Sequence, residues 1–540
     1  MKVLLVQPPV RDFYETSLRL QPLGLCYLKG AAKKFLPEVE VLIKDYHAGF
    51  GRRTVPVPEE LSYLTAYYGT PDSSPFSLFH NYYHFGKSYE EIGDELTEIA
   101  PDVVGISSLF SAYHREALEV ADCVKKRLGV PVIVGGTHAS EVPDFVLSQS
   151  SVDYVIRGEG ERPFVEFIRF LLGRCRIEDV PNLGYKKAGQ IFFNPMADPC
   201  GIDEIPFPDL GDFSPDRYTH ARRPLSLMMT SRGCPHRCSF CSVHATFGTR
   251  YRRRSTDSIL EEIKLRYTEG YRFIDFEDDN LSFDRKEFTR LMKEVISMFP
   301  ERDMEFAAMN GISYMSLDAD ILSLMKQAGF SHLNLSLVSA DRDVRNQSLR
   351  PHTIDAYSRI VDAAFSLGFR IVSYQILGLP YEELDSMIRT LGFQGRIPVL
   401  LGASPFYLTP GCLLAKGMTL TEQDYVKARL TALAVETGLW ERDDIYTLFV
   451  ATRIINFLKG LELPASAGLS DLMMMHWNDS RQMVGFELLR RLMQDGVLYF
   501  RTSHGNVINT KFQVPLFIKV LREMEYICCQ NGRRIAIDVL

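Results

Sequence analysis

The 540-residue sequence lacks a basic excess, since 61 Lys and Arg stand against 68 Asp and Glu, for a net charge of −7. Nucleic-acid-binding proteins usually carry such an excess, so we expect no nucleic-acid partner. No apolar run approaches the roughly 18 residues that a membrane-crossing helix needs. The short apolar run at the N-terminus lacks a small-residue cleavage site. These absences predict a soluble cytoplasmic protein without a membrane partner.

Cysteine is scarce as well, with ten in the chain, yet Cys234, Cys238 and Cys241 fall within eight positions. In a reducing cytosol, clustered thiols indicate metal or redox chemistry rather than disulfides. A closed zinc site usually takes four ligands, so the trio fits zinc poorly, although His236 or His244 could serve as the fourth. An iron–sulfur cubane on three thiolates leaves one iron open to a substrate. The trio therefore favours an iron–sulfur cluster, and the scattered cysteines are interpreted as ordinary core or surface thiols.

The first 175 residues alternate short apolar strands with amphipathic helices. Strands that are apolar throughout indicate a parallel sheet covered on both faces. We therefore predict an α/β protein that begins with a doubly wound, Rossmann-like domain over residues 1–175. Ligands of such sheets lie at the carboxyl ends of the strands. At these ends the sequence places Pro8, Pro9, Ser107, Ser108, Gly135, Gly136, His138, Gly158, Glu159 and Gly160.

Three further regions follow in the chain. Residues 176–225 have a weaker pattern, with a small hairpin and a proline-rich connector, and are interpreted as a linker. Residues 226–414 hold half a dozen strand–helix units, which predict a partial (β/α)6 barrel with its site at the carboxyl ends of the strands. Residues 415–540 are mostly helical and carry no motif. Within the first domain, an aromatic-rich insertion over residues 49–88 either serves a function or packs its own aromatic side chains.

At its cysteine loop the chain resembles the radical S-adenosylmethionine (SAM) superfamily, whose C-x-x-x-C-x-x-C motif matches Cys234, Cys238 and Cys241. "FEDDN" at the end of the second barrel strand and "ILGLP" at the fifth agree with that family in order and placement. The resemblance implies a 4Fe-4S cluster that binds SAM and reduces it to a 5′-deoxyadenosyl radical. The SAM-binding residues that the resemblance suggests are Phe240, Glu277, Asp278, Ser336, Arg350, Gln375, Leu377 and Gly378.

Two parts of this SAM assignment have alternatives. Glu277 is chosen for the methionine amine, because a carboxylate beside an ammonium makes a charge-assisted hydrogen bond. Asp278 and Asp279 fit equally well as caps of the following helix. Related sequences often carry Glu where Val338 stands, which weakens the sugar and carboxylate contacts assigned nearby.

The N-terminal domain resembles the cobalamin-binding domain that precedes the radical module in one subgroup, so the resemblance covers about residues 1–415. Its usual D-x-H-x-x-G signature, which gives cobalt a histidine, is missing after the first strand, where the sequence reads "QPPVRDFYE". "DYHAGF" follows the second strand instead and has Phe50 where the glycine belongs. We therefore expect no histidine on the lower face of cobalt, and we interpret His138 as a wall residue rather than a ligand.

The resemblance implies a cobalamin-dependent radical SAM enzyme, and methylation of an unactivated carbon is the leading hypothesis. Ring formation or rearrangement is the alternative, and a non-catalytic corrinoid sensor is disfavoured by the intact Glu277 and "ILGLP" elements. Expected partners are a small-molecule or peptide substrate and a reductant of the flavodoxin or ferredoxin type. Tyr407 is one candidate substrate contact, whereas Trp477 is more readily explained as core. The sequence does not identify the substrate.

Overall fold

The computed structural model describes residues 1–16, 21–350 and 352–539. The chain divides into two compact units, which are described separately. Unit 1 comprises Met1–Val55, Tyr82–Leu281 and Leu408–Ala428, and unit 2 comprises Pro56–Asn81, Ser282–Tyr407 and Arg429–Leu540. Within the described ranges, every helix is too short or too polar to cross a membrane.

Unit 1 contains a seven-stranded sheet in the order β10-β9-β8-β7-β6-β1-β3. Its parallel strands are β1 (Lys2–Gln7), β3 (Glu40–Asp45), β6 (Val103–Ser107), β7 (Val132–Gly135) and β8 (Tyr154–Ile156). This order reverses direction between β1 and β6, and doubly wound folds bind their ligands at such a switch point. The predicted Rossmann-like domain is confirmed.

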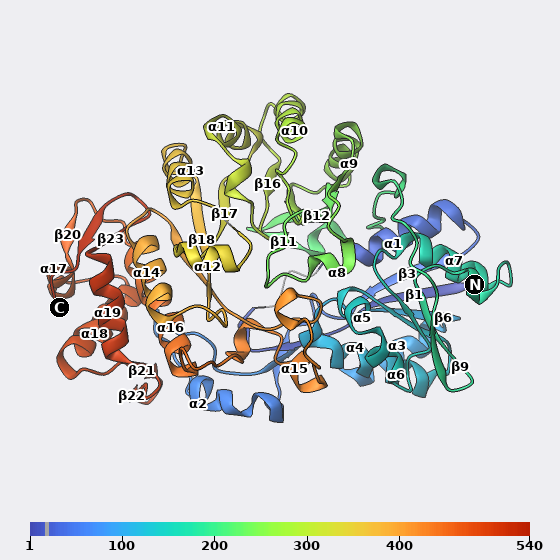
Figure 1. The fold of residues 1–540 in the computed structure, drawn as a ribbon, viewed down its shortest axis with the longest axis horizontal. Coiled ribbons are helices and arrows are strands. Elements are labelled where there is room, and N and C mark those ends of the chain that lie inside the picture. The colour runs from blue at the N-terminus through green and yellow to red at the C-terminus, as the bar shows by residue number, and fades with distance from the viewer. Residues whose placement is uncertain (17–20, 351, 540) are drawn as a thin grey trace. The chain divides into compact units, whose positions relative to one another are not determined.

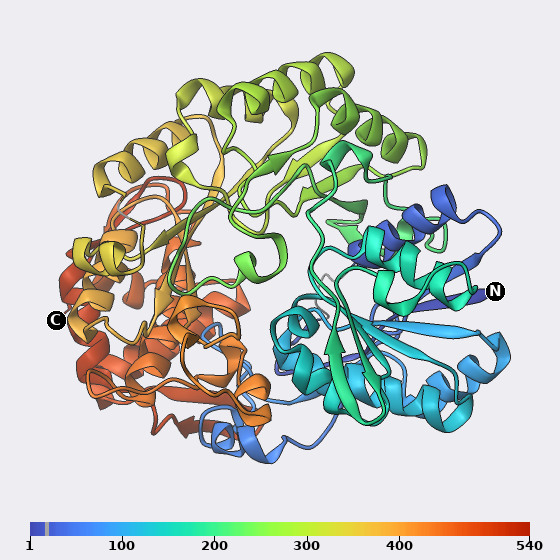
Figure 2. The same cartoon turned by 45° about the vertical axis from the view of Figure 1, so that its right-hand side comes forward.

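The sheet extends beyond the predicted domain boundary. A hairpin of β9 (Leu183–Lys187) and β10 (Gln190–Phe193) pairs antiparallel with β8 and continues the sheet (Figure 2). The sequence predicted this hairpin correctly but placed it in a linker. Its pairing with β8 makes it part of the N-terminal sheet.

Helices cover both faces of the sheet of unit 1. Because side chains alternate along each strand, neighbouring residues lie in opposite cores. Val3 and Leu5 belong to the core beneath α1 (Leu23–Phe35) and α7 (Glu161–Leu171). Leu4 and Val6 belong to the opposite core, beneath α3 (Tyr89–Ile99) and α4 (His114–Arg127) (Figure 1). All four side chains are at most 1% exposed, so β1 reads as an uninterrupted apolar run.

The insertion of residues 49–88 is shared between the units. Its two ends form β4 (Arg52–Thr54) and β5 (Tyr83–Phe85), which build a small antiparallel sheet with β2 (Val10–Asp12) in unit 1. Its middle, Pro56–Asn81, belongs to unit 2 and includes η1 (Glu59–Leu64) and α2 (Thr65–Tyr68).

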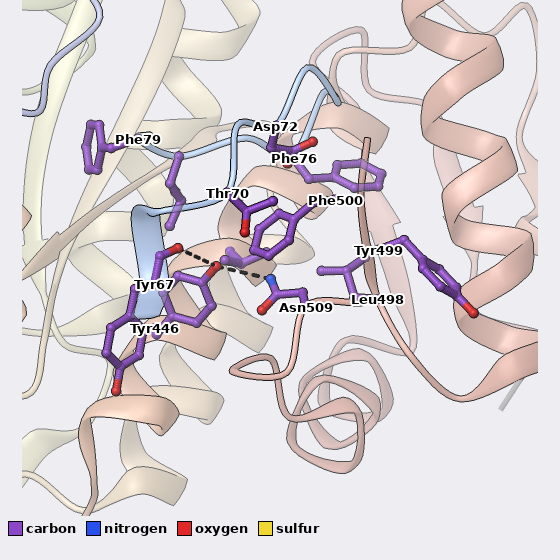
Figure 3. A pocket seen from close by; sticks show the side chains of 12 residues that line it. Tyr67, Thr70, Asp72, Phe76, Phe79, Tyr446, Leu498, Tyr499, Phe500 and Asn509 are labelled. Atoms are coloured by element: carbon purple, nitrogen blue, oxygen red, sulfur yellow. Dashed lines mark hydrogen bonds between the residues drawn. The ribbon is translucent and has the colours of Figure 1, made fainter. Parts of the chain in front are cut away.

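The middle of the insertion packs against the C-terminal region of unit 2 (Figure 3). The Tyr67 and Tyr446 rings lie 5.1 Å apart, and the Tyr446 hydroxyl accepts a 3.1 Å hydrogen bond from Asn509 Nδ2. Asp72 Oδ1 accepts a 2.9 Å hydrogen bond from the Arg501 amide. The remaining cavity is only about 10 Å³, barely enough for one water. The aromatic side chains therefore pack on another part of the chain, and no ligand fits between them.

Six strand–helix units follow one another after the N-terminal sheet, as predicted for the partial barrel. Unit 1 holds the first two strands, β12 (Arg223–Met228) and β15 (Phe273–Phe276), which pair in parallel, with α9 (Thr256–Thr268) between them in sequence. The strands in unit 2 are β16 (Glu305–Ala307), β17 (His332–Val338), β18 (Arg370–Leu377) and β19 (Leu400–Pro405), the last three forming a parallel sheet.

Helices of unit 2 cover this part of the barrel. They are α10 (Arg285–Met298), α11 (Ala319–Ala328), α12 (Arg342–Gln347), α13 (Ile354–Ser366) and α14 (Leu384–Gly395). Helices α10, α11 and α13 stand side by side (Figure 1). Each begins with a capping side chain, such as Asp284 on α10 and Thr353 on α13, which satisfies a free amide of the first turn.

The C-terminal part of unit 2 contains helices and small sheets. Its helices are α16 (Arg442–Lys459), α17 (Leu469–Met474), α18 (Ser480–Asp495) and α19 (Val514–Met524). Its strands are β20 (Ala467–Gly468), β21 (Tyr499–Thr502), β22 (Gly505–Ile508), β23 (Tyr526–Cys528) and β24 (Arg534–Ala536). Lys459 at the end of α16 is fully buried, and its Nζ donates to four carbonyls, those of Gln394, Gly395, Ile397 and Cys528, at 2.7–3.2 Å. This ammonium therefore joins the C-terminal end of α14 to β23.

Candidate active site

The three clustered cysteines lie on one loop of unit 1, directly after β13 (Ser231–Arg232). Cys238 is buried, and Cys234 and Cys241 are half-buried. The loop turns at Gly233, which has φ +79°, and a Cβ there would lie 2.5 Å from the Arg250 carbonyl. Glycine is therefore required before the first cysteine. Phe240 is half-buried within the same loop.

The donor set of this loop fits an iron–sulfur cluster better than a single ion. Burial, followed by smaller effects of the neighbouring thiols and Asp279, raises the pKa of Cys241 to about 11. Within the described part of the chain, no three His, Cys, Asp or Glu side chains converge on one metal position. His244 Nε2 instead lies 3.2 Å from the Cys234 carbonyl, which leaves a zinc site with His244 as its fourth ligand unsupported. Three separate thiolates on one loop suit a cluster that offers each of them its own iron.

The acidic motif after β15 fastens the segment that leads into this loop. Asp278 is 2% exposed, and its carboxylate accepts hydrogen bonds from the Thr230 amide at 3.1 Å, from the Thr230 hydroxyl at 2.7 Å and from the Ser231 hydroxyl. Asp279 Oδ2 accepts from the Gly233 amide at 3.2 Å. Burial raises the pKa of Asp279 to about 6.

These contacts correct both interpretations of Asp278. Its two carboxylate oxygens are already engaged by the loop, so the predicted contact with SAM is not supported. The capping alternative is wrong as well, because the cap of α10 is Asp284, whose Oδ1 accepts from the Glu287 amide at 3.1 Å. Glu277 is half-buried and its amide donates to the Met228 carbonyl at 2.8 Å, so it remains the candidate for the amine contact.

Two arginines connect the cysteine loop to the strand-end loop after β8. Arg232 is 5% exposed and donates to Glu159 at 2.8 Å and to Glu161 at 2.5 and 3.2 Å. Arg252, on β14 (Arg252–Arg253), also pairs with Glu159. Because β13 and β14 bracket the cysteine loop, these ion pairs tie it to Gly158-Glu159-Gly160. Glu159, predicted to contact cobalamin, uses its carboxylate to hold two arginines.

A cavity of about 250 Å³ lies beside this ion-pair network in unit 1. It is lined by Gly158, Glu159, the connector Met196–Cys200 and α8 (Val243–Phe247) with the residues beside it. Leu109 and Phe110, which follow Ser107 and Ser108 at the end of β6, are 43% and 46% exposed. Exposed apolar side chains after β6 and a cavity beside the loop after β8 lie at carboxyl ends of the same sheet, and they fit a large, flat, partly apolar cofactor with side groups.

His138 lies inside the domain rather than at its surface. It is fully buried, its Nδ1 lies 2.9 Å from the Ser111 hydroxyl, and its ring centroid is 5.2 Å from those of His114 and Tyr425. Burial, with a smaller effect of His114, lowers the pKa of His138 to about 3. At the neighbouring turn Gly136 has φ +112°, and a Cβ there would lie 2.6 Å from the Ser108 carbonyl. His138 is therefore packed inside the domain, and its predicted contact with cobalamin is not supported.

The segment after β1 has no histidine to offer. Pro8 and Pro9 lead directly into β2, where Arg11 pairs with Glu119 at 2.8 and 3.0 Å and Asp12 accepts from the Tyr113 hydroxyl at 2.7 Å. His47, in the misplaced near match, is 1% exposed at the end of the edge strand β3. In this chain the paired strand β2 follows β1 at the place where the D-x-H-x-x-G signature would form a loop.

Two of the predicted SAM residues in unit 2 contact one another. Arg350 Nη1 donates to the Ser336 hydroxyl at 3.1 Å, and both side chains are half-buried. Val338, which ends β17, has φ +70°, an uncommon conformation for a β-branched residue that accompanies an irregular register with β18. A strained strand end is common where backbone and side chains are arranged for a ligand.

The side chains of Gln375 and Leu377 face away from the expected ligand. Both are fully buried, and Gln375 Nε2 donates to the Met387 carbonyl of α14 at 3.1 Å. Alternation along β18 places Tyr374 and Ile376 on the other face, where they are half-buried. The predicted contact of the Gln375 and Leu377 side chains with SAM is therefore not supported, and Tyr374 and Ile376 occupy the other face of β18.

The "ILGLP" loop is held by two residues that sequence reasoning missed. Gly378 has φ +85°, and a Cβ there would lie 3.0 Å from the Trp440 ring. Trp440 Nε1 donates to the Glu382 carbonyl at 3.1 Å, and the buried Glu382 carboxyl accepts from the Ser339 and Ser386 hydroxyls at 2.9 and 2.8 Å. Burial raises the pKa of Glu382 to about 7. This network joins the ends of β17 and β18.

The two candidate substrate contacts differ in their surroundings. Tyr407 is half-buried just after β19. Trp477 stacks on Phe486 with ring centroids 4.6 Å apart, and its Nε1 donates to the Leu472 carbonyl at 3.0 Å. Its ring and its nitrogen are thus both used within the C-terminal region, which favours the core interpretation.

Comparisons with known proteins match both the N-terminal domain and the barrel. Residues 228–393 match the Radical SAM superfamily and residues 80–168 match the B12 binding domain. The chain is 26% identical over 419 residues to cytidylyl-2-hydroxyethylphosphonate methyltransferase of Streptomyces wedmorensis, covering 70% of this chain and 73% of that protein. It is 23% identical over 316 residues to the anaerobic magnesium-protoporphyrin IX monomethyl ester cyclase of Rubrivivax gelatinosus, covering 56% of each.

A solved structure has a similar fold. The radical SAM methyltransferase TsrM from Kitasatospora setae, with cobalamin and a [4Fe-4S] cluster bound, aligns with a TM-score of 0.58 at 15% identity, over 79% of this chain and 81% of that chain. At this identity the likeness concerns the fold, and it supports the order of a Rossmann-like domain followed by a partial barrel.

Proposed function

The chain belongs to the radical SAM enzymes that carry a B12 binding domain, and from that premise we propose that it methylates an unactivated carbon of a small molecule or peptide. The observation that carries the proposal is the ion-pair network of unit 1. It fastens the cysteine loop to a strand-end loop of the B12 binding domain through Arg232, Glu159 and Glu161. A chain in which the two cofactor loops are joined by buried charges suits chemistry that uses both cofactors.

The cofactors are a 4Fe-4S cluster, SAM and cobalamin, which together supply a 5′-deoxyadenosyl radical and a transferable methyl group. Cys234, Cys238 and Cys241 would hold the cluster, and Asp278 with Asp279 fixes the entry to their loop. The protein's part is to orient these groups and to exclude water.

Two further sets of residues would contact the cofactors. In unit 2, the paired Ser336 and Arg350 would take the polar groups of SAM, and the backbone at Gly378 would lie against its adenine. In unit 1, the strand ends with Leu109 and Phe110 would support the corrinoid. We further propose a cytoplasmic location, a reductant of the flavodoxin or ferredoxin type and no nucleic-acid partner.

Ring formation without methyl transfer is the second candidate, since one relative is named a cyclase. The two reactions differ in what happens to the methyl group of SAM. A methylating enzyme has to reload cobalamin from SAM, whereas a cyclase has no such requirement.

The decisive experiment incubates the anaerobically reconstituted, reduced chain with cobalamin and SAM that carries a deuterated methyl group. Mass spectrometry should find the deuterated methyl group on cobalamin, together with S-adenosylhomocysteine and 5′-deoxyadenosine. Release of 5′-deoxyadenosine with no methylation of cobalamin would favour the cyclase reaction. Formation of neither product would refute the proposed function.

A further inference from the structure

Asn280, the last residue of "FEDDN", lies beside the first cysteine of the loop. Its side chain is 4% exposed, and its Nδ2 is 4.0 Å from Cys234 Sγ, at the outer limit for an N–H donor facing sulfur. Its Oδ1 is buried and finds no hydrogen-bond partner among the residues that the structure describes. A buried amide is costly unless it is used. The cysteine sulfur is the partner that its donor group faces.

The position of Asn280 follows from the contacts before it. The Glu277 amide donates to Met228, Asp278 accepts from Thr230 and Ser231, and Asp279 accepts from Gly233. Successive residues of this motif therefore contact successive parts of the segment that enters the loop. Asn280 is the next residue, and Cys234 is the next position after Gly233. The contacts of the three preceding residues therefore fix the position of the Asn280 amide beside the Cys234 sulfur.

We infer that Asn280 donates a hydrogen bond to the Cys234 thiolate and thereby raises the reduction potential of the cluster. The inference rests on the cluster of the proposed function. Hydrogen bonds to the cysteine sulfurs are one of the controls on such potentials, together with net charge and exposure to solvent. Reduction adds negative charge to the cluster and its thiolates, so a donor stabilises the reduced state more than the oxidised state. Asn280 is accordingly a positioning residue that tunes a ligand and binds no iron itself.

The effect should be measurable because the site is buried. Water cannot replace the amide freely at a side chain that is 4% exposed. In such surroundings a hydrogen bond to a charged group is stronger than in water. Removing the donor should therefore leave the thiolate without that stabilisation and lower the potential.

The test is a redox titration of the reconstituted full-length chain, without SAM or substrate, followed by electron paramagnetic resonance of the reduced cluster. In Asn280→Leu, which keeps the approximate shape and removes the donor, the midpoint should move to a more negative potential. Asn280→Asp replaces the donor with a carboxylate and should move the midpoint further in the same direction. Resonance Raman spectra of Asn280→Leu should show a stiffer iron–thiolate bond, which a merely structural role would not produce.

Asn194→Leu is the matched control. Asn194 is also buried, but its amide donates to the carbonyls of Ile177 and Val180 at 2.7 and 2.8 Å in the N-terminal domain. That variant should keep the wild-type potential.

Two results would overturn the inference. The first is a wild-type midpoint in Asn280→Leu at full iron and sulfide content. The second applies if Asn280→Leu cannot hold the cluster, in which case an unshifted midpoint in Asn280→Asp decides against the hydrogen bond. The redox titration does not measure methyl transfer, so its result can be interpreted even if the methylation proposal is wrong. A wild-type chain that binds no iron would refute the cluster and the inference together.

Discussion

Two loops with predicted cofactor contacts, one in each unit, are held in place by different chemistry. In unit 1, the cysteine loop is fastened by charged side chains, with Arg232 and Arg252 on Glu159 and Glu161. In unit 2, the "ILGLP" loop is held by an indole and by a buried carboxyl that accepts from two hydroxyls, centred on Trp440 and Glu382. A loop that would carry charged metal ligands is thus held by ionic contacts, whereas the loop that would contact a nucleoside is held by neutral hydrogen bonds and packing.

Removing the three clustered thiols should have the largest effect. Changing Cys234, Cys238 and Cys241 to Ala should abolish the cluster and all 5′-deoxyadenosine formation, because no described group of His, Cys, Asp or Glu side chains is arranged to hold a metal in their place. Corrinoid binding should persist, since the strand ends of the N-terminal sheet carry none of these thiols. Iron and sulfide analysis with the visible spectrum of bound corrinoid measures both. Stoichiometric iron and sulfide in the triple variant would contradict the assignment.

The next largest effect should come from breaking the ionic fastening of unit 1. Arg232→Met leaves Glu161 buried without its guanidinium, and removal of one partner from a buried pair costs roughly 3–5 kcal/mol. The midpoint of thermal or urea unfolding should fall accordingly. Arg176→Met is the control, because the Arg176–Asp179 pair is 78% and 46% exposed and such pairs contribute about 0–1 kcal/mol. Equal effects of the two substitutions would mean that the buried network does not hold the loop.

The buried Glu382 carboxyl in unit 2 should make the folding stability depend on pH. The pKa of Glu382 rises from 4.5 to about 7 on folding, because burial disfavours the carboxylate. Between these values the folded chain keeps a proton that the unfolded chain has lost, so stability falls as pH rises through the window, by about 3 kcal/mol in total. Glu382→Gln should lose this decline, so its melting temperature should gain on the wild type from pH 5 to pH 8.

The control for this profile is Glu301→Gln, which removes an exposed carboxylate from the same unit. It corrects for the general effect of one charge on the unfolding curve. Parallel wild-type and Glu382→Gln curves across the window would show that the Glu382 carboxyl does not take up a proton on folding.

The sequence revealed the parts of this site whose chemistry requires close spacing. Three thiols within eight positions form a local pattern, and fully buried parallel strands are apolar along their whole length, so both features could be recognised in the sequence. Contacts between positions far apart in the chain could not be predicted, because no local sequence pattern indicates them. Examples are Arg232–Glu161, Trp440–Glu382 and Tyr425–His138.

The errors have equally physical causes. Gln375 lies on the face of β18 that packs on α14, because side chains alternate along a strand and a difference of one position exchanges its faces. Asp278 precedes a helix, as a cap would, yet Asp284 lies nearer to its first turn. The middle of the aromatic insertion packs on α16, a partner more than 350 positions away that its own composition could not identify.

The smallest expected effect concerns the lower face of cobalt, and it compares two histidines that the fold keeps inside. The chain from Pro8 to Gly30 contains no histidine, His47 is 1% exposed and His138 is fully buried among aromatic rings. Bound cobalamin should therefore carry no histidine nitrogen, and a missing axial base makes cob(II)alamin easier to reduce. Electron paramagnetic resonance of the cob(II) form should show unsplit cobalt lines in the wild type, in His47→Ala and in His138→Ala. A triplet splitting that disappears in one of these variants would identify that histidine as the ligand. It would also mean that the side chains packed around that histidine move apart when the corrinoid binds.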